Sequence, residues 1–238
     1  MAFGSDRKVM TQEQVRRAEI DVGLRQYMLR VYNYMCAALA MTGLVAYIVS
    51  TNETMMAYIF GTPLMWVAIF APLALVFFIS FRINHMSAAT AQMTFWIYAC
   101  LVGLSLSILF LAYSGTSIAR VFFITASAFA GLSIIGYTTK KNLSGMGSFL
   151  FMGLIGLIVA MVVNIFLGSS TLEMLISFAG VLIFAGLTAY DTQQIKLMYY
   201  EGDGSEVATK KAVMGALKLY LDFLNMFLFL LHIFGGRE

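Results

Sequence analysis

Two aspartates stand inside apolar stretches of the chain. Asp191 directly follows G-L-T-A-Y (186–190), and Asp222 lies within L-Y-L-D-F-L-N (219–225). A charge at the centre of a bilayer costs ~3 kcal/mol on insertion scales, so such residues face the interior of a helix bundle or a watery cavity. Two carboxyl groups close together in a low dielectric cannot both ionise cheaply, and they hold a shared proton near neutrality. We interpret Asp191 and Asp222 as a proton sensor and gate.

The composition around these aspartates is that of an integral membrane protein. The 238 residues are 61% hydrophobic and 11% charged, with a mean hydropathy of +0.85, whereas soluble domains are about one quarter charged. A helix needs ~20 mostly apolar residues to cross a bilayer. The sequence has seven apolar runs of about that length, at 31–50, 64–81, 95–113, 118–137, 148–167, 172–190 and 215–234.

The runs predict an all-α membrane protein with seven transmembrane helices. None alternates with a period of two, which excludes an outer-membrane barrel. Residues 1–27 are predicted to form a cytoplasmic N-terminal tail, with a short surface helix over 12–27 capped by Thr11, and residues 28–238 the bundle. Because charges interrupt the last run, 215–238 either spans the membrane or forms a re-entrant hairpin.

Lysine and arginine predict the orientation. With the N-terminus inside, only Arg120 and Arg237 of the fifteen Lys and Arg residues lie outside, as the positive-inside rule requires. The net charge of +3 is explained by the inner segments, so we expect no nucleic acid partner.

The same orientation places the two aspartates at similar depth. If the sixth helix continues to about residue 200, Asp191 lies ~13 Å from its inner end at 1.5 Å per residue. Asp222 lies seven residues beyond Gly215, or ~10 Å into the seventh helix. The carboxyl groups would therefore meet on antiparallel neighbours joined by one loop.

The seventh helix carries a polar stripe. Lys218, Asp222, Asn225 and His232 are spaced 4, 3 and 7 residues apart and share one side of a helix. A polar stripe in a membrane protein faces other helices, so we expect this helix to be central or to line a cavity.

The chemistry predicted for this pair is a pH-gated cation pathway. Protonated, the pair ties the sixth and seventh helices together by a hydrogen bond; deprotonated, it repels or recruits a cation. Ca²⁺ prefers oxygen ligands, which Asp191 and Asp222, with Asn225 and carbonyl groups, would supply transiently. Arg82 either anchors the inner surface or pairs with one carboxylate in the closed state, and Lys218 belongs to the same polar set. Either aspartate could instead simply hydrogen-bond a neighbouring helix.

Other chemistries find little support. The sequence has no CxxC, HExxH, GxSxG or phosphate-binding glycine loop, and Cys36 and Cys100 are predicted to be small buried side chains. Intramembrane aspartyl proteolysis needs G-x-G-D and Y-D motifs; Tyr190-Asp191 matches one half, but no glycine precedes Asp222. We therefore expect no enzyme and no cofactor, with Ca²⁺ as a permeant ion only.

Three segments resemble the Bax-inhibitor family, also called transmembrane Bax-inhibitor-motif proteins. These are G-L-T-A-Y-D-T-Q (186–193), G-A-L-K-L-Y-L-D-F-L-N-M-F-L-F-L-L (215–231) and Y-T-T-K-K-N-L-S-G-M-G (137–147). The resemblance covers 25–238, and the short tail and loops look most like the bacterial inner-membrane branch.

The resemblance implies a central C-terminal helix surrounded by six others and a pH-sensitive Ca²⁺ leak. It matches the family's paired aspartates to Asp191 and Asp222, and an arginine latch to Arg82 in a region that matches poorly. An acidic residue found in the second helix of some relatives is missing from 64–81. Some bacterial relatives are tied to a membrane-anchored protease, so the alternative function is a non-conducting regulator of membrane protein quality control. The partners expected are the lipid bilayer, Ca²⁺ and H⁺, and in the alternative that protease.

Overall fold

The protein is a bundle of helices. The computed structural model describes residues 12–236, with side chains from residue 21 onward, and within this part of the chain it has no strand. Seven helices are long and apolar enough to cross a membrane, which confirms the predicted fold class. In chain order the elements are α1 (Gln12–Ser50), α2 (Glu53–Phe60), α3 (Leu64–Arg82), η1 (Ile83–His85), α4 (Ala88–Leu106), α5 (Leu109–Ala112), α6 (Gly115–Thr138), α7 (Ser144–Leu167), α8 (Ser170–Leu197) and α9 (Ser205–Phe234).

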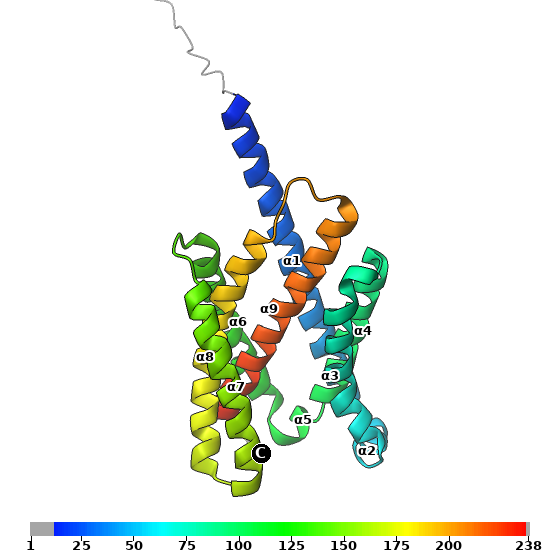
Figure 1. The fold of residues 1–238 in the computed structure, drawn as a ribbon. Helices are drawn as coiled ribbons and strands as arrows, with labels where there is room; N and C mark the ends of the chain where they lie inside the picture. The colour runs from blue at the N-terminus through cyan, green and yellow to red at the C-terminus, as the bar shows by residue number, and fades with distance from the viewer. Residues whose placement is uncertain (1–11, 237–238) are drawn as a thin grey trace, which may run out of the picture.

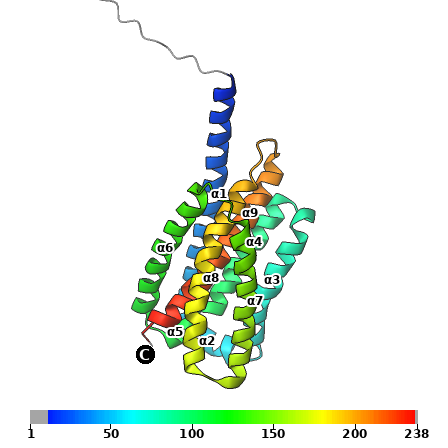
Figure 2. The same cartoon turned by 60° about the vertical axis from the view of Figure 1, so that its left-hand side comes forward.

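The first helix is longer than its apolar run. The short helix predicted over 12–27 and the run at 31–50 are one continuous helix, α1, and the capping residue proposed for it, Thr11, lies outside the described residues. Figures 1 and 2 show the first turns of α1 projecting past the ends of the other helices. Tyr27 and Met28 are already buried in the core, so α1 packs in the bundle from about this point onward.

Two interruptions of the predicted pattern appear between α1 and α6. The connection at 51–63 contains the short helix α2, whose first turn is capped by the Asn52 side chain accepting from the Met55 amide at 3.0 Å. The third run is interrupted where α4 ends, and the Ser107 hydroxyl there donates to the Leu104 carbonyl at 2.7 Å. The helix α3 matches its run at 64–81 and includes Pro72 in its interior.

The last helix is the most buried of the seven. It is continuous from Ser205 to Phe234, which excludes the re-entrant hairpin. Buried residues make up 56% of its membrane-spanning stretch, against 11% to 39% for the others. It packs on α8 most extensively and also on α1, α6 and α4, whereas α3 and α7 pack chiefly on α4 and α8. In Figure 1, α9 runs diagonally between the pair α6 and α8 and the pair α3 and α4. The arrangement of six helices around one is therefore not confirmed.

A small polar junction joins three helices in the core. The fully buried Tyr220 on α9 shares a hydrogen bond of 2.7 Å with the Thr42 hydroxyl on α1, and Thr42 donates to the Ala99 carbonyl of α4 at 2.9 Å. The ring of Tyr220 also packs edge-on against Phe95 and Tyr98. This junction fixes α9 against α1 and α4, while α8 packs on another side of α9.

Candidate functional site

The two aspartates meet inside the bundle. Asp191 on α8 is 6% exposed and Asp222 on α9 is 4% exposed. Their carboxyl groups interact with each other and with the Lys218 ammonium, whose Nζ lies 3.6 Å from Asp191 Oδ1. The helices α8 and α9 also share the largest interface in the bundle. The site is thus a pair of buried carboxyl groups with one neighbouring cation.

The two aspartates lie side by side, but their distances from the ends of α8 and α9 differ from those predicted. The helix α8 ends at Leu197, so Asp191 is ~9 Å from that end, but α9 begins ten residues before Gly215, so Asp222 is ~26 Å from its own start. The carboxyl groups still meet, because α9 extends farther than α8 at this end of the bundle.

The pair has hydrogen-bonding capacity left over. Asp191 Oδ1 and Asp222 Oδ2 are both buried, and neither has a hydrogen-bond partner among the described residues. Buried acceptors in folded proteins are nearly always satisfied. A carboxyl group becomes a donor only when it is protonated. The arrangement can therefore take up either a proton or a cation.

The C-terminal end of α8 is held by hydrogen bonds to α6 and to the loop that follows α6. The Thr192 hydroxyl shares a hydrogen bond of 3.0 Å with Ser133 on α6. Gln193 accepts from the Leu143 amide and donates to the Lys141 carbonyl, each at 2.8 Å. These contacts hold the turn of α8 that carries Asp191.

One more bond fastens the same end, and a close backbone contact accompanies it. The Lys196 ammonium donates to the Tyr137 carbonyl at 2.9 Å. A Cβ at Gly136 on α6 would overlap the carbonyl oxygen of Ala189 on α8, so the backbones touch only because this residue is glycine. Sequence reasoning missed these supporting residues, although T-Q directly after Asp191 and the segment 137–147 were both part of the motifs.

The remaining predicted site residues do not reach the pair in this structure. The Asn225 amide donates to the Leu221 carbonyl of its own helix at 2.8 Å. Arg82 is exposed at the end of α3, and among the described residues no hydrogen bond or ion pair links it to either aspartate. His232, at the far end of the stripe, lies 3.7 Å from Glu173. Of the predicted polar set, the structure brings only Lys218 to the aspartates.

The acidic ligands for a cation are few. Among residues 12–236 as described, no three His, Cys, Asp or Glu side chains lie close enough together to hold a metal ion. A cation at this site would have the two carboxylates as its acidic ligands and would compete with the Lys218 ammonium for them. Two acidic ligands suit transient binding of a cation better than a permanent metal site.

The chain is similar to a known family over nearly its whole length. Residues 24–238 match the family described as "Inhibitor of apoptosis-promoting Bax1". The chain is 48% identical over 218 residues to an uncharacterized protein of Rickettsia prowazekii, with 92% of each chain covered. It is 43% identical over 219 residues to "Inner membrane protein YbhL" of Escherichia coli strain K12, covering 91% of this chain and 94% of the relative.

A more distant relative points the same way. A Streptococcus pyogenes protein whose name calls it a membrane protein is 34% identical over 220 residues, covering 92% of this chain and 96% of the relative. Its name and that of the Escherichia coli relative agree with seven helices that are apolar enough to cross a membrane. Together with the family match, they identify this chain as a membrane protein of the Bax-inhibitor family.

Proposed function

We propose that the protein is a pH-sensitive, calcium-permeable leak channel gated by Asp191 and Asp222. The observation that carries this proposal is the interaction of two buried carboxyl groups across the α8–α9 interface, with one oxygen on each left without a hydrogen-bond partner. A buried pair of ionisable groups inside a membrane bundle is costly, and such groups usually mark an ion or proton pathway.

The charge balance of the site suggests how protons would act. With one shared proton, the pair carries a single negative charge, and the Lys218 ammonium at 3.6 Å from Asp191 neutralises it. Loss of that proton leaves one negative charge uncompensated in a low-dielectric interior, which is costly. The described charged group facing the pair is Lys218, so the repulsion would fall on the α8–α9 interface and loosen it.

Calcium would be the cation that relieves this repulsion. Ca²⁺ is a hard ion that takes carboxylate and carbonyl oxygens as ligands. Two ionised carboxylates would attract it into the bundle, and competition from the Lys218 ammonium for the same carboxylates would favour its release. Conduction requires such a site to be favourable to enter and weak enough to leave.

The test is calcium flux through purified protein in liposomes, measured between about pH 6 and pH 8. The double variant Asp191→Asn with Asp222→Asn should flatten the pH dependence, because the amides neither ionise nor share a proton. The matched control is Glu206→Gln, which neutralises an exposed acidic residue on the same helix as Asp222 and should leave the profile unchanged. An unaltered pH profile in the double variant would reject the gating role.

A second candidate is a non-conducting regulator of membrane protein quality control that acts on a membrane-anchored protease. The feature that favours it is the projection of α1 beyond the bundle (Figures 1 and 2), which offers a helix to a partner. Removing the residues before Asp21 distinguishes the two functions. If cells lose the protein's phenotype while reconstituted flux persists, the phenotype depends on the projecting helix and not on conduction, which favours a regulatory role. If both persist, the projecting helix is dispensable.

A further inference from the structure

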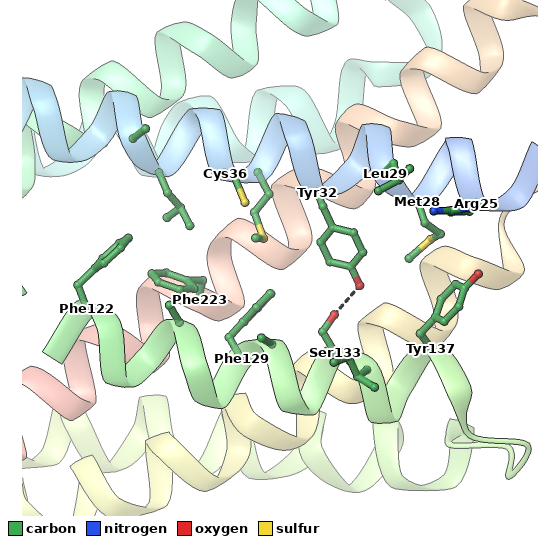
Figure 3. A pocket seen from close by; sticks show the side chains of 16 residues that line it. Arg25, Met28, Leu29, Tyr32, Cys36, Phe122, Phe129, Ser133, Tyr137 and Phe223 are labelled. Atoms are coloured by element: carbon green, nitrogen blue, oxygen red, sulfur yellow. Dashed lines mark hydrogen bonds between the residues drawn. The ribbon is translucent and has the colours of Figure 1, made fainter. Parts of the chain in front are cut away.

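An apolar groove lies between α1 and α6, with α9 as its floor (Figure 3). Its volume is about 870 Å³, within the range of ~300–1,000 Å³ typical of ligand sites. The two helices have no extensive interface with each other, and the bond between the Tyr32 and Ser133 hydroxyls bridges them. Cys36, which was expected to be buried, is exposed and lines this groove.

The lining is almost entirely hydrocarbon. Methionine, leucine, alanine and phenylalanine side chains predominate, with Phe122 at one end and Phe223 of α9 at the floor. The two hydroxyl groups of the middle section, on Tyr32 and Ser133, bond to each other, and Ser133 also bonds to Thr192. A polar or peptide ligand would find few partners along this wall, whereas an alkyl chain needs none.

One end of the groove is positively charged. Arg25 and Tyr137 lie together at that end (Figure 3), and Arg25 is exposed with no ion pair to any acidic side chain among residues 21–236. The Lys196 ammonium lies 4.9 Å from the centre of the Tyr137 ring. Basic pockets between membrane helices are suited to anionic lipid headgroups.

The length of the groove matches one leaflet. From Arg25 to Ala40, the lining residues of α1 span ~22 Å along the helix axis at 1.5 Å per residue. Half of a ~30 Å hydrocarbon core is ~15 Å, which leaves several ångströms for the headgroup region around Arg25. The charged end is also the one predicted to face the cytoplasm.

We propose that this groove binds one acyl chain of an anionic phospholipid from the cytoplasmic leaflet. The chain lies along α1 and α6 over Phe223, and the headgroup phosphate pairs with Arg25 beside Lys196. Apolar walls select a lipid, and the positive end selects its charge. This site is separate from the carboxyl pair, so it stands whether or not the protein conducts calcium.

The headgroup contact is tested by native mass spectrometry of the full chain in detergent, with phosphatidylglycerol or phosphatidylethanolamine of identical acyl chains added. The unaltered protein should retain phosphatidylglycerol preferentially. Arg25→Gln should lower that preference about fivefold, the effect of one basic side chain on an anionic headgroup. The matched control is Arg30→Gln, since Arg30 is also exposed on α1 but does not line the groove; it should keep the preference.

The chain contact is tested by filling the groove. Ala130→Phe places a ring in the groove and should reduce the bound fraction of both lipids, whereas Ala128→Phe, at an exposed position of α6 outside the groove, should not. Equal retention of the two lipids, equal losses for the two arginine variants or equal effects of the two phenylalanine variants would each overturn the proposal. So would a dimer that Ala130→Phe abolishes, because a second copy would then be the occupant.

Discussion

The helices α7 and α9 both cross the membrane, but they differ in opposite directions in hydropathy and in burial. The most apolar stretch of α7 has a mean hydropathy of 2.7 and is 11% buried, whereas that of α9 has a mean hydropathy of 1.6 and is 56% buried. In a soluble protein the more apolar helix would be the buried one. Here lipid solvates apolar side chains as well as protein does, so it is the polar residues that need an interior. Polarity therefore marks the inside of this bundle.

Contacts between helices differ in the same way between the buried and the lipid-facing parts of the bundle. Along α6, Gly136 lies directly against the backbone of α8, while a Cβ at Gly131 would meet nothing within 4 Å. Polar side chains and small residues are concentrated at α8 and α9, whereas the faces of α3 and α7 away from the bundle carry large exposed apolar side chains. Substitutions at the close or polar helix contacts should therefore lower stability, whereas matched substitutions at exposed positions should not.

The largest effect is expected at the close contact between α6 and α8. Gly136→Ala would force the Ala189 carbonyl away, and overpacking of this kind costs ~1–3 kcal/mol. We expect the melting temperature in detergent to fall by about 2–12 °C, at ~2–4 °C per kcal/mol for a chain of this size. Gly131→Ala on the same helix should leave it unchanged or raise it slightly. Equal losses at both glycines would contradict the proposed contrast.

The next effect concerns the side chain that fastens α8 to the loop after α6. Gln193→Leu would leave the Leu143 amide and the Lys141 carbonyl without their partner, at a cost of ~2 kcal/mol. Its neighbour Gln194 has a buried amide nitrogen with no hydrogen-bond partner among the described residues, so Gln194→Leu should be neutral or stabilising. Thermal unfolding of the two variants side by side measures the difference, and reversed stabilities would refute it.

A smaller effect is expected at the cation beside the carboxyl pair, and it rests on the proposed function. Lys218→Met removes the charge that favours the ionised carboxylate, so the proton leaves the pair only at higher pH. Because the lysine side chain is 42% exposed, we expect the flux profile to move upward by roughly half a pH unit to one unit. Lys210→Met, on the same helix but paired with Glu206, should not move it. A downward shift for Lys218→Met would exclude this electrostatic role.

The smallest effect is expected at the polar junction of α1, α4 and α9. Tyr220→Phe removes the hydrogen bond to Thr42 but keeps the ring contacts. Hydrogen bonds between membrane helices contribute ~0.6 kcal/mol on average, so the melting temperature should fall by about 1–2 °C. Tyr58→Phe, at a residue that is 63% exposed, serves as the control. A loss as large as that of Gly136→Ala would mean that this junction stabilises the bundle as much as the α6–α8 contact does.

Several features were predictable because the bilayer imposes them on the sequence. The number of spans follows from run length, and the burial of Asp191 and Asp222 follows from the cost of charge in lipid. The predicted continuation of the sixth helix beyond Asp191 is confirmed by the end of α8 at Leu197. The location of Arg82 relative to the pair was not predictable, because a residue at a helix end carries no information about which neighbour lies beside it.

The sequence by itself determined that this chain forms seven apolar helices with two acidic residues that must be enclosed, since length and polarity are local properties and the membrane acts on each helix separately. Only the tertiary structure decided that Lys218 and not Arg82 accompanies the pair, that Gln193 fastens α8, and that α1 and α6 stay apart to leave a groove. Those outcomes depend on which helices pack together and how far each extends past its neighbour, and such packing is fixed by side-chain shape across the whole bundle.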